Sequence, residues 1–426
     1  MIACSAQLFA ADQPQKPSIV LIMADDLGYG DVGCFGSDRF DTPNIDSLAD
    51  DGIRLTDFHS NGAVCSPTRA ALLTGRYQQR TGITGVVTAA GHRDTGLDLK
   101  EVTFAEILKK AGYRTAMFGK WHLGYQPDFN PVRQGFDEFV GYVSGNVDYH
   151  NHLDQTGRED WWKQDELTPE EGYTTDLITE HGVRFIQRNK DKPFLLYLAH
   201  EAPHYPYQGR RDPPRYIEGK GRTKDPVSLE TYQEMIEVMD EGIGRIRNAI
   251  DEAGLSENTF IFFFSDNGPA GPGSAGELRG KKGQIFEGGH RVPAVACWPG
   301  TIKAGRVSDA TGMGADLLPT MAAIAGAKIP EGLRIDGVNL LPHLSEGTPL
   351  PERSLFWGVK RGLAIRKGDY KLITNEPFRN PSLYNLNTDL GENNDLAKEQ
   401  PEVVDELLQE LKAWQEDVTK GVKQRT

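Results

Sequence analysis

Two pairs of adjacent polar residues carry oxygen atoms that could bind a metal ion. Asp25 and Asp26 directly follow one apolar run, and Asp266 and Asn267 directly follow another. Carboxylate and amide oxygens are ligands of hard divalent cations, Ca²⁺ or Mg²⁺, rather than of zinc. Each pair alone also fits a turn or a helix N-cap. Together, at neighbouring strand ends, the two pairs favour a metal site.

Basic side chains and histidines follow two further apolar runs in the same way. Lys120 and His122 come after the run 113–118, and His204 comes after the run 193–199. A single Lys or His at such a place is more often a solvated loop residue. Ligand sites of open α/β sheets, however, lie outside the carboxyl ends of the strands, where residues distant in sequence converge. Four polar strand ends therefore predict one active site at this edge.

The elements that must position these residues can be read from the alternation of apolar runs and helical patterns. Short β-branched and apolar runs predict strands, and apolar residues at helical spacing predict helices. The expected strands are 18–23, 113–118, 193–199 and 259–264, and the expected helices are 103–111, 176–188 and 229–253. Alternating strands and helices predict an α/β fold with a doubly wound, mostly parallel central sheet.

After residue 337 the alternation of strands and helices gives way to short strand-like runs followed by one helix, which predicts a smaller C-terminal α+β subdomain. Its expected elements are the strands 354–359, 363–366 and 370–374 and a helix over 401–418. We therefore divide the chain into an N-terminal segment (1–16), a catalytic domain (17–337) and the subdomain (338–426). The N-terminal segment resembles the end of a secretory signal without its basic part, which predicts a periplasmic or secreted protein. If this N-terminus is native, a cytoplasmic protein is the alternative.

Composition excludes several classes of function. The chain of 426 residues has 47 Lys and Arg against 61 Asp and Glu, a net charge of −14. That balance argues against nucleic-acid binding, which needs a basic surface. No apolar run approaches the roughly 20 residues of a membrane span, so stable membrane insertion is not expected. The four cysteines lack CxxC spacing, which argues against a zinc cage, and whether Cys34 and Cys297 pair is left open.

Cys65 lies in a segment with its own chemical signal. The segment Cys65-Ser66-Pro67-Thr68-Arg69 predicts a helix with an early proline, so Cys65 is expected near the N-cap. The helix dipole and free N–H groups there favour an anion. A lone cysteine is more often an inert core residue, so position alone does not decide its role.

This segment, continued by Leu73-Thr74-Gly75-Arg76, resembles the signature of the type I sulfatases. In that family a maturation enzyme oxidises the cysteine of C-x-P-x-R to Cα-formylglycine (3-oxoalanine). Further family motifs recur in the same order: DDLG at 25–28, GKWHLG at 119–124, APH at 202–204, SDNG at 265–268, and KG with EGG between 282 and 289. The resemblance covers the chain to about residue 335. It implies an alkaline-phosphatase-like fold and the hydrolysis of a sulfate ester.

The resemblance also implies a role for each matching residue. One calcium ion, or magnesium in its place, would be bound by Asp25, Asp26, residue 65, Asp266 and Asn267. A hydroxyl of the hydrated formylglycine would be the nucleophile. The remaining catalytic residues would be Arg69 as a support for the diol or the carboxylates, Lys120, His122 and Lys282 around the sulfate, His204 as general acid, and His122 also as base.

The expected substrate is a sulfated polysaccharide or oligosaccharide, with carrageenan-type galactans as one candidate. The polar, aromatic loop 141–152 is placed as in carbohydrate sulfatases, and Asp148, His150 and His152 could bind sugar hydroxyls. Trp161 and Trp162 could supply a stacking surface. A structural loop with a tryptophan plug is the equal alternative. Three cations could recognise further sulfates or a uronate: His92, Arg93 and Arg279.

Three other interpretations remain open at this point. A phosphatase or phosphodiesterase on the same scaffold would bind two zinc ions and use a Ser or Thr nucleophile. A generic arylsulfatase would act on small aromatic sulfates. A non-catalytic glycan-binding relative would lack Cys65, Arg69 or His204, and all three are present. The expected partners are the sulfated glycan and a formylglycine-generating or sulfatase-maturing enzyme.

Overall fold

The computed structural model describes residues 16–223, 227–359, 362–376 and 378–426. The expected secretory segment therefore lies outside the described residues, apart from Lys16. Among the helices in these ranges, none combines the length and the apolar character that a membrane crossing requires. The three cysteines in these ranges, Cys34, Cys65 and Cys297, form no disulfide with one another.

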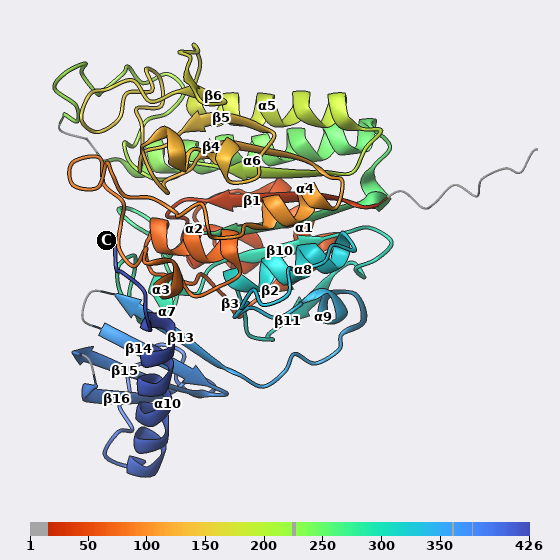
Figure 1. Cartoon of the computed structure of the whole chain (residues 1–426). Helices are drawn as coiled ribbons and strands as arrows, with labels where there is room; N and C mark the ends of the chain where they lie inside the picture. Colours follow the sequence, from red (N-terminus) through yellow and green to blue (C-terminus); the bar gives the residue numbers. More distant parts are fainter. Residues whose placement is uncertain (1–15, 224–226, 360–361, 377) are drawn as a thin grey trace, which may run out of the picture.

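A ten-stranded mixed sheet forms the centre of the described structure (Figure 1). Its five middle strands are parallel and lie in the order β9 (Thr259–Ser265), β1 (Ser18–Ala24), β8 (Phe194–Ala199), β4 (Arg114–Lys120) and β5 (Glu138–Tyr142). Beyond β9 lie β10 (Ala294–Cys297), β2 (Ile53–Leu55) and β11 (Arg306–Ser308), and beyond β5 lie β6 (Trp162–Lys163) and β7 (Glu166–Leu167). The predicted doubly wound, mostly parallel sheet is confirmed.

Helices cover both faces of this sheet, and the alternating residues of β1 show how. Ile19, Leu21 and Met23 belong to the core shared with α2 (Cys65–Thr74), α4 (Phe104–Lys110) and α8 (Leu317–Ile324). Val20 and Ile22 belong to the core shared with α1 (Pro43–Asp50), α5 (Thr174–Asn189) and α6 (Leu229–Glu252). Because both faces of the strand are covered, every residue of β1 is apolar or small and buried.

Further short elements lie outside this sheet. They are β3 (Phe58–His59), β12 (Gly312–Met313), α3 (Gln78–Thr81), α7 (Glu287–His290) and α9 (Leu341–Glu346). Helix boundaries follow local chemistry. Thr103 and Glu106 form a capping box at the start of α4, and α2 ends where Gly75 takes the left-handed conformation that favours glycine.

The register of the central strands brings four polar segments to one edge of the sheet. Ala24 at the end of β1 pairs with Ser265 at the end of β9, and Met23 pairs with Ala199 at the end of β8. Ala199 in turn pairs with Gly119 of β4. The residues that follow these strand ends therefore start from neighbouring positions, as the sequence predicts for an open parallel sheet.

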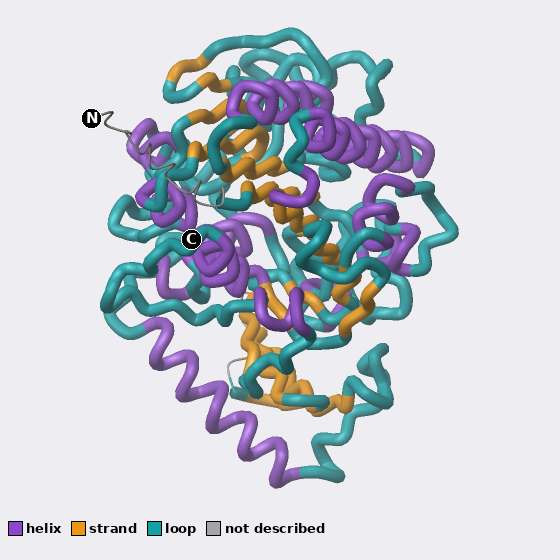
Figure 2. The backbone as a smooth tube through the Cα atoms, turned by 90° about the vertical axis from the view of Figure 1, so that its right-hand side faces the viewer, coloured by secondary structure: helices purple, strands orange, loops and turns teal. Residues whose placement is uncertain are grey.

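A four-stranded antiparallel sheet lies below the central domain, at the lower end of the molecule in Figure 2. It consists of β13 (Ser354–Val359), β14 (Gly362–Lys367), β15 (Tyr370–Glu376) and β16 (Arg379–Asn385), and α10 (Pro401–Thr419) packs on it through Leu411 and Trp414. The sequence did not predict β16, because its segment RNPSLYN is polar and contains a proline. After α10 the chain returns to the central domain, where the Arg425 amide donates to the Gly82 carbonyl at 2.8 Å (Figure 1).

A buried network of charged groups joins the C-terminal sheet to the central domain. Lys371 of β15 donates to Glu287 at 2.8 Å and lies 3.1 Å from Nε2 of His290. Arg366 of β14 donates to Asp57 at 2.8 Å. His59 lies between the two groups, with its Nδ1 2.9 Å from Nδ1 of His290. Because cations of the C-terminal sheet neutralise acids of the central domain, the two parts share one buried ionic contact.

Candidate active site

Asp25 and Asp26 meet Asp266 and Asn267 where β1 and β9 end side by side. The backbone N–H of Asp26 donates to Oδ1 of Asp266 at 3.3 Å, and Nδ2 of Asn267 donates to Oδ1 of Asp26 at 2.8 Å. Asp26 has a φ of 65°, a left-handed conformation that turns the chain sharply after the strand. The four side chains are fully or almost fully buried. Two segments about 240 residues apart thus form one acidic site.

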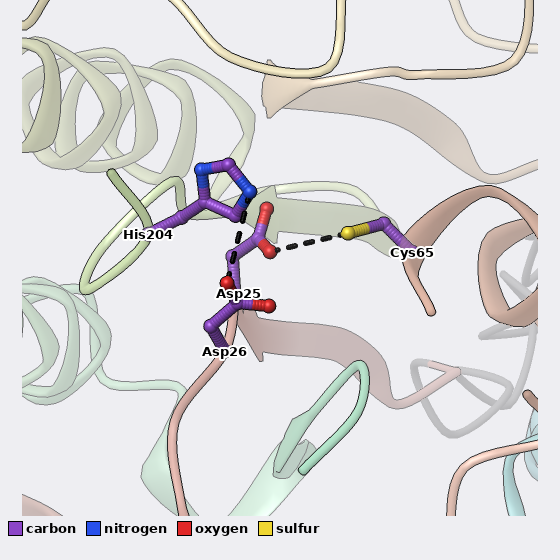
Figure 3. Close-up of side chains that lie close together, drawn as sticks. All are labelled: Asp25, Asp26, Cys65 and His204. Atoms are coloured by element: carbon purple, nitrogen blue, oxygen red, sulfur yellow. Dashed lines mark hydrogen bonds and ion pairs between the residues drawn. The ribbon is translucent and has the colours of Figure 1, made fainter. Parts of the chain in front are cut away.

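Cys65 lies against this acidic site at the first residue of α2. Its Sγ is 3.5 Å from Oδ1 of Asp25 and 3.3 Å from Nζ of Lys282. Figure 3 shows Cys65 on one side of the two carboxylates and His204 on the other. Burial and then Asp25 raise the pKa of the Cys65 thiol well above its usual range. The unmodified side chain is therefore a neutral thiol, which is both a poor nucleophile and a poor metal ligand.

Three cations surround the carboxylates: Arg69 and Lys120 are buried, and Lys282 is partly exposed. Arg69 Nη2 lies 3.3 Å from Asp25 Oδ2 and 3.1 Å from Asp266 Oδ2. Lys120 donates to Asp25, and Lys282 Nζ lies 2.6 Å from Asp26 Oδ1. The formal charges of three acids and three cations cancel. A further divalent cation would therefore make the site positive, which suits an anionic substrate.

The two aspartates at the centre of the site differ in pKa. Burial raises the pKa of Asp25, but Lys120 and the other nearby cations outweigh it and hold that pKa well below its usual range. Burial, reinforced by the charge of Asp25, raises the pKa of Asp266 to about 6. Asp25 is thus an anion at neutral pH even in this buried place, because the cations around it compensate for lost hydration.

His204 and His122 reach the site from β8 and β4. His204 Nδ1 lies 2.6 Å from the Tyr205 carbonyl, to which only an N–H can donate, so Nε2 is left facing Asp26 Oδ2 at 3.7 Å. Burial and Lys282 lower the pKa of His204 to about 4. His122 Nε2 donates to the Val87 carbonyl at 3.1 Å, which leaves its Nδ1 as the acceptor. Burial and Lys120 hold the pKa of His122 well below its usual range.

The donor atoms of the site fit a hard divalent cation. Ligand atoms of Asp25, Asp26, Cys65 and His204 all lie within 4.8 Å of one another. Oδ2 of Asp26 and Oδ1 of Asn267 are buried and have no hydrogen-bond partner among the described residues. Buried oxygens normally have a partner, and a bound cation would supply one for these two unsatisfied oxygens.

A second group of possible ligands in the described structure does not fit a metal. His59, Glu287 and His290 also have ligand atoms within 4.8 Å of one another. Lys371 already occupies that place, however, because its ammonium group contacts both Glu287 and His290. A positively charged ion would meet this ammonium group directly, so we assign the group to the ionic contact between the domain and the C-terminal sheet.

Asp148 is the first of the residues expected to bind sugar hydroxyls, and its side chain is completely buried. Its carboxylate accepts hydrogen bonds from the backbone N–H groups of His150 at 3.0 Å, Asn151 at 3.1 Å and Tyr216 at 2.9 Å. Gln208 donates to it as well, at 3.2 Å. These bonds use the carboxylate to hold two loops together, which favours the structural alternative for this residue.

His150 and His152 line a surface cavity with Trp161, and none of the described residues of the buried acidic site lines it. His152 stacks on Trp161 with ring centroids 4.4 Å apart. The cavity is also lined by acidic residues: Glu159, Asp160, Glu170 and Glu171. Such a lining suits sugar hydroxyls better than sulfates, because like charges repel. Trp162 donates to Asp160 at 2.7 Å and is half-buried.

The three expected sulfate-recognising cations are dispersed over the described surface. Arg93 donates to Asp154 at 2.9 Å on a rim loop. His92 Nδ1 lies 3.0 Å from the Thr88 hydroxyl within its own turn. Arg279 packs over the Phe286 ring at 4.0 Å and donates to the backbone of the C-terminal subdomain. None of these contacts involves a residue of the buried acidic site, and the substrate contacts of the three cations stay predictions.

The sequence analysis did not identify two residues that neighbour the site, Val87 and Tyr205. Val87 contributes only its carbonyl, to His122, and its type gives no signal of that contact. Tyr205 stacks on His204 with ring centroids 4.3 Å apart. Its position next to the APH motif, at the start of a basic loop, was the available signal for Tyr205.

Comparison with known proteins agrees with this geometry. The model of the family named Sulfatase matches residues 17–327. N-acetylgalactosamine-6-sulfatase of Rattus norvegicus is 35% identical and covers 85% of this chain and 72% of its own. Arylsulfatase A of Homo sapiens is 36% identical and covers 97% of this chain and 89% of its own.

The fold is also similar to that of a solved structure. The crystal structure of Ps i-CgsB in complex with k-i-k-neocarrahexaose has a TM-score of 0.86 and 30% sequence identity, covering 96% of this chain and 94% of that one. The family match, the identity to curated sulfatases and the cysteine that faces a buried acidic site lead to one conclusion. The chain belongs to the sulfatase family and is a sulfuric ester hydrolase.

Proposed function

We propose that this sulfatase removes sulfate from a sulfated carbohydrate, with a formylglycine made from Cys65 and one bound calcium ion. One observation carries the proposal: Cys65 Sγ lies between a carboxylate oxygen of Asp25 at 3.5 Å and the ammonium group of Lys282 at 3.3 Å. A nucleophile at this point would face both a metal site and a cation for the sulfate oxygens. Magnesium is the alternative ion, because the ligand set is hard oxygen.

The chemistry of Cys65 explains why modification would be needed. As a neutral, buried thiol it would attack sulfur poorly. When present, the formylglycine would supply a hydroxyl nucleophile through hydration of its aldehyde, and the bound cation would lower the pKa of that hydroxyl. Arg69 would keep the carboxylates of Asp25 and Asp266 in place through its two contacts with them.

The remaining residues handle charge and protons. Lys282 would bind the sulfate oxygens, because it is the partly exposed cation of the site, and Lys120 would hold Asp25 ionised. His204 would act on the departing oxygen through Nε2, since its Nδ1 donates to the Tyr205 carbonyl. To give a proton from Nε2 the ring must carry protons on both nitrogens, a form that the negative charge of a bound sulfate ester would favour. His122 would accept a proton at Nδ1, the nitrogen that its bond to Val87 leaves free of hydrogen.

A carbohydrate substrate is supported by the proteins that this chain resembles. One relative is named for a sulfated amino sugar, and the similar solved structure contains a neocarrahexaose. We therefore rank a sulfated oligosaccharide or polysaccharide first, with a carrageenan-type galactan as one candidate. Arylsulfatase A is an equally similar relative, so a small aryl sulfate is the second candidate.

Parallel assays on matched substrates test the proposal. The protein, co-expressed with a formylglycine-generating enzyme, is assayed on sulfated galactan oligosaccharides, 4-nitrophenyl sulfate and 4-nitrophenyl phosphate. We expect sulfate release to exceed phosphate release, and the oligosaccharide to give the higher kcat/KM of the two sulfates. Faster phosphate release would contradict sulfatase function. A higher kcat/KM on the aryl sulfate would favour the second candidate.

Metal removal tests the ion. Treatment with a chelator should abolish sulfate release, and added Ca²⁺ should restore it, with one ion bound per chain by elemental analysis. A bound ion should also raise the melting temperature of the protein. Cys65→Ala should keep part of this increase, because the aspartates that bind the ion remain. Two zinc ions per active chain would contradict the proposal and favour a phosphatase or phosphodiesterase instead.

A further inference from the structure

Two rim loops next to the site are held together by their backbones. The Arg222 backbone N–H donates to the Gln155 carbonyl at 3.1 Å, and the Gly219 N–H donates to the Gly157 carbonyl at 2.9 Å. Gly157 has a φ of 77°, and a Cβ there would lie only 2.5 Å from the Gly221 nitrogen. Such close packing requires glycine, so the loop 217–222 has a fixed position on the turn 154–158.

The same turn fixes a second arginine. Asp154 accepts a hydrogen bond from Arg93 Nη2 at 2.9 Å, and Thr156 accepts one from the same atom at 3.1 Å. Arg93 and Arg222 are therefore anchored to residues of one short turn, Asp154 to Thr156. Arg93 is neutralised by Asp154. Arg222, which is exposed, forms no ion pair with any carboxylate in the described ranges.

Arg222 also lies one aromatic ring away from the proposed general acid. Its Cζ is 4.3 Å from the centre of the Tyr205 ring, and that ring stacks on His204 at 4.3 Å with an interplanar angle of 29°. Asn146 Nδ2 holds the Tyr205 carbonyl at 3.2 Å. The ring thus fixes the guanidinium on the side of the site where the group that leaves the sulfur is protonated.

A planar guanidinium that lacks a carboxylate partner and is held by an aromatic ring is a receptor for an oxyanion. The net charge of the chain is −14. The positive charge of Arg222, which no described carboxylate neutralises, is therefore opposite in sign to that of the molecule as a whole. Glu218, a described acidic residue four positions before Arg222, is exposed and forms no ion pair with it in the described structure.

We propose that Arg222 binds a second anionic group of the substrate, a sulfate on the sugar next to the one that loses its sulfate. Tyr205 is a positioning residue, which holds the guanidinium beside His204. This inference rests on the proposed carbohydrate sulfatase function and adds a substrate class to it. The preferred substrate is a glycan with sulfates on neighbouring sugars, rather than one with a single sulfate.

The test compares three substrates with one variant. Arg222→Ala and the parent are assayed on a galactan oligosaccharide with sulfates on neighbouring sugars, on its mono-sulfated counterpart, and on 4-nitrophenyl sulfate. Loss of one charge-assisted contact should lower kcat/KM on the multiply sulfated substrate about tenfold relative to the other two, mainly through KM. Arg222→Glu should lower that ratio further, because it adds repulsion. Arg184→Ala, an exposed arginine on α5, is the matched control for charge and should leave the ratio unchanged.

The outcomes separate the inference from the proposed function. If the parent hydrolyses sulfates but Arg222→Ala changes all three substrates equally, or none of them, Arg222 does not bind a second sulfate. If the parent hydrolyses neither oligosaccharide, the carbohydrate proposal itself is wrong. Thermal unfolding of each variant checks that the rim loop is intact, since Arg222 is exposed and its removal should not change the melting temperature.

Discussion

Lys282 differs from the other cations of the described active site in its access to solvent. Its side chain is 20% exposed, whereas Lys120 and Arg69 are completely or almost completely buried. Asp26 and the other acids raise the pKa of Lys282 well above its usual range despite burial, so it stays charged. A charged and accessible ammonium group beside residue 65 is the group that can meet an incoming sulfate.

Replacement of Lys282 should therefore affect catalysis far more than folding. Lys282→Ala should reduce kcat/KM for 4-nitrophenyl sulfate by about 10²–10³, the range observed when one stabilising group of a transition state is removed. The neighbouring variant Lys281→Ala is the control, since Lys281 is exposed and outside the site. Steady-state kinetics of both variants provide the measurement. Equal rates for the two variants would show that Lys282 does not contact the sulfate.

The residue types in the site were predictable for a specific reason. Asp25, Asp266 and His204 follow strands whose parallel order sends them to one edge of the sheet, so sequence alone indicated their convergence. The surroundings of Asp148 were not predictable in this way. Its partners Gln208 and Tyr216 come from a loop some 60 residues away, and only the folded chain brings them to the carboxylate.

At the scale of elements, the loop around Asp148 is held by that one carboxylate. Asp148→Ala would leave four backbone N–H groups and one side-chain amide without their acceptor, at a cost of about 1–3 kcal/mol for each buried group left unsatisfied. We expect a free energy of unfolding lower by about 3 kcal/mol, in denaturant titrations. Asp165→Ala, at an exposed ion pair in the same region, is the control.

The kinetic consequence of Asp148→Ala distinguishes a structural role from sugar binding. A structural carboxylate predicts that oligosaccharide and aryl sulfate activities fall by the same factor. A rise in KM for the oligosaccharide alone, with unchanged stability, would establish direct sugar contact instead.

Element boundaries show where local sequence is sufficient and where it is not. The predicted strand 354–359 and the helix after Pro401 agree with β13 and α10, because apolar spacing and proline at the first turn are local signals. β16 was missed because its pairing with β15, and not its composition, makes it a strand. Complete burial of α2 was also not evident, since its residues include Ser66 and Arg69.

At the scale of the whole molecule, the contact between the domain and the C-terminal sheet contains two neutral histidines. Burial lowers the pKa of His59, and burial with Lys371 lowers the pKa of His290 well below its usual range. Unfolded histidine titrates at about 6.5. The charged groups that face the pair are Asp57, Glu287, Arg291, Arg366, Lys371 and Glu392.

These shifts predict loss of stability as pH falls below about 6.5, because the unfolded chain then binds protons that the folded chain excludes. Asp57 and Glu287, whose pKa values are held well below the usual range, add losses only at lower pH. Burial raises the pKa of Glu392, which acts in the opposite direction. His290→Gln should reduce the slope of unfolding free energy between about pH 6.5 and 4.5 by up to about 1.4 kcal/mol per pH unit.

Denaturant titrations at several pH values measure this slope. His92→Gln, outside the network, should retain the slope of the parent. A parent whose stability is constant from neutral pH to pH 4.5 would contradict the neutral state of the buried histidines.

The central claim is that turnover depends on oxidation of Cys65 beside the bound cation. Its most direct test is peptide mass spectrometry across residues 63–69, combined with turnover measured on the same samples. Preparations made with increasing amounts of maturation enzyme should contain increasing fractions of a peptide about 18 Da lighter than the cysteine form. The account predicts that turnover is proportional to that fraction and vanishes with it. Full turnover in a preparation whose Cys65 is entirely unmodified would contradict it.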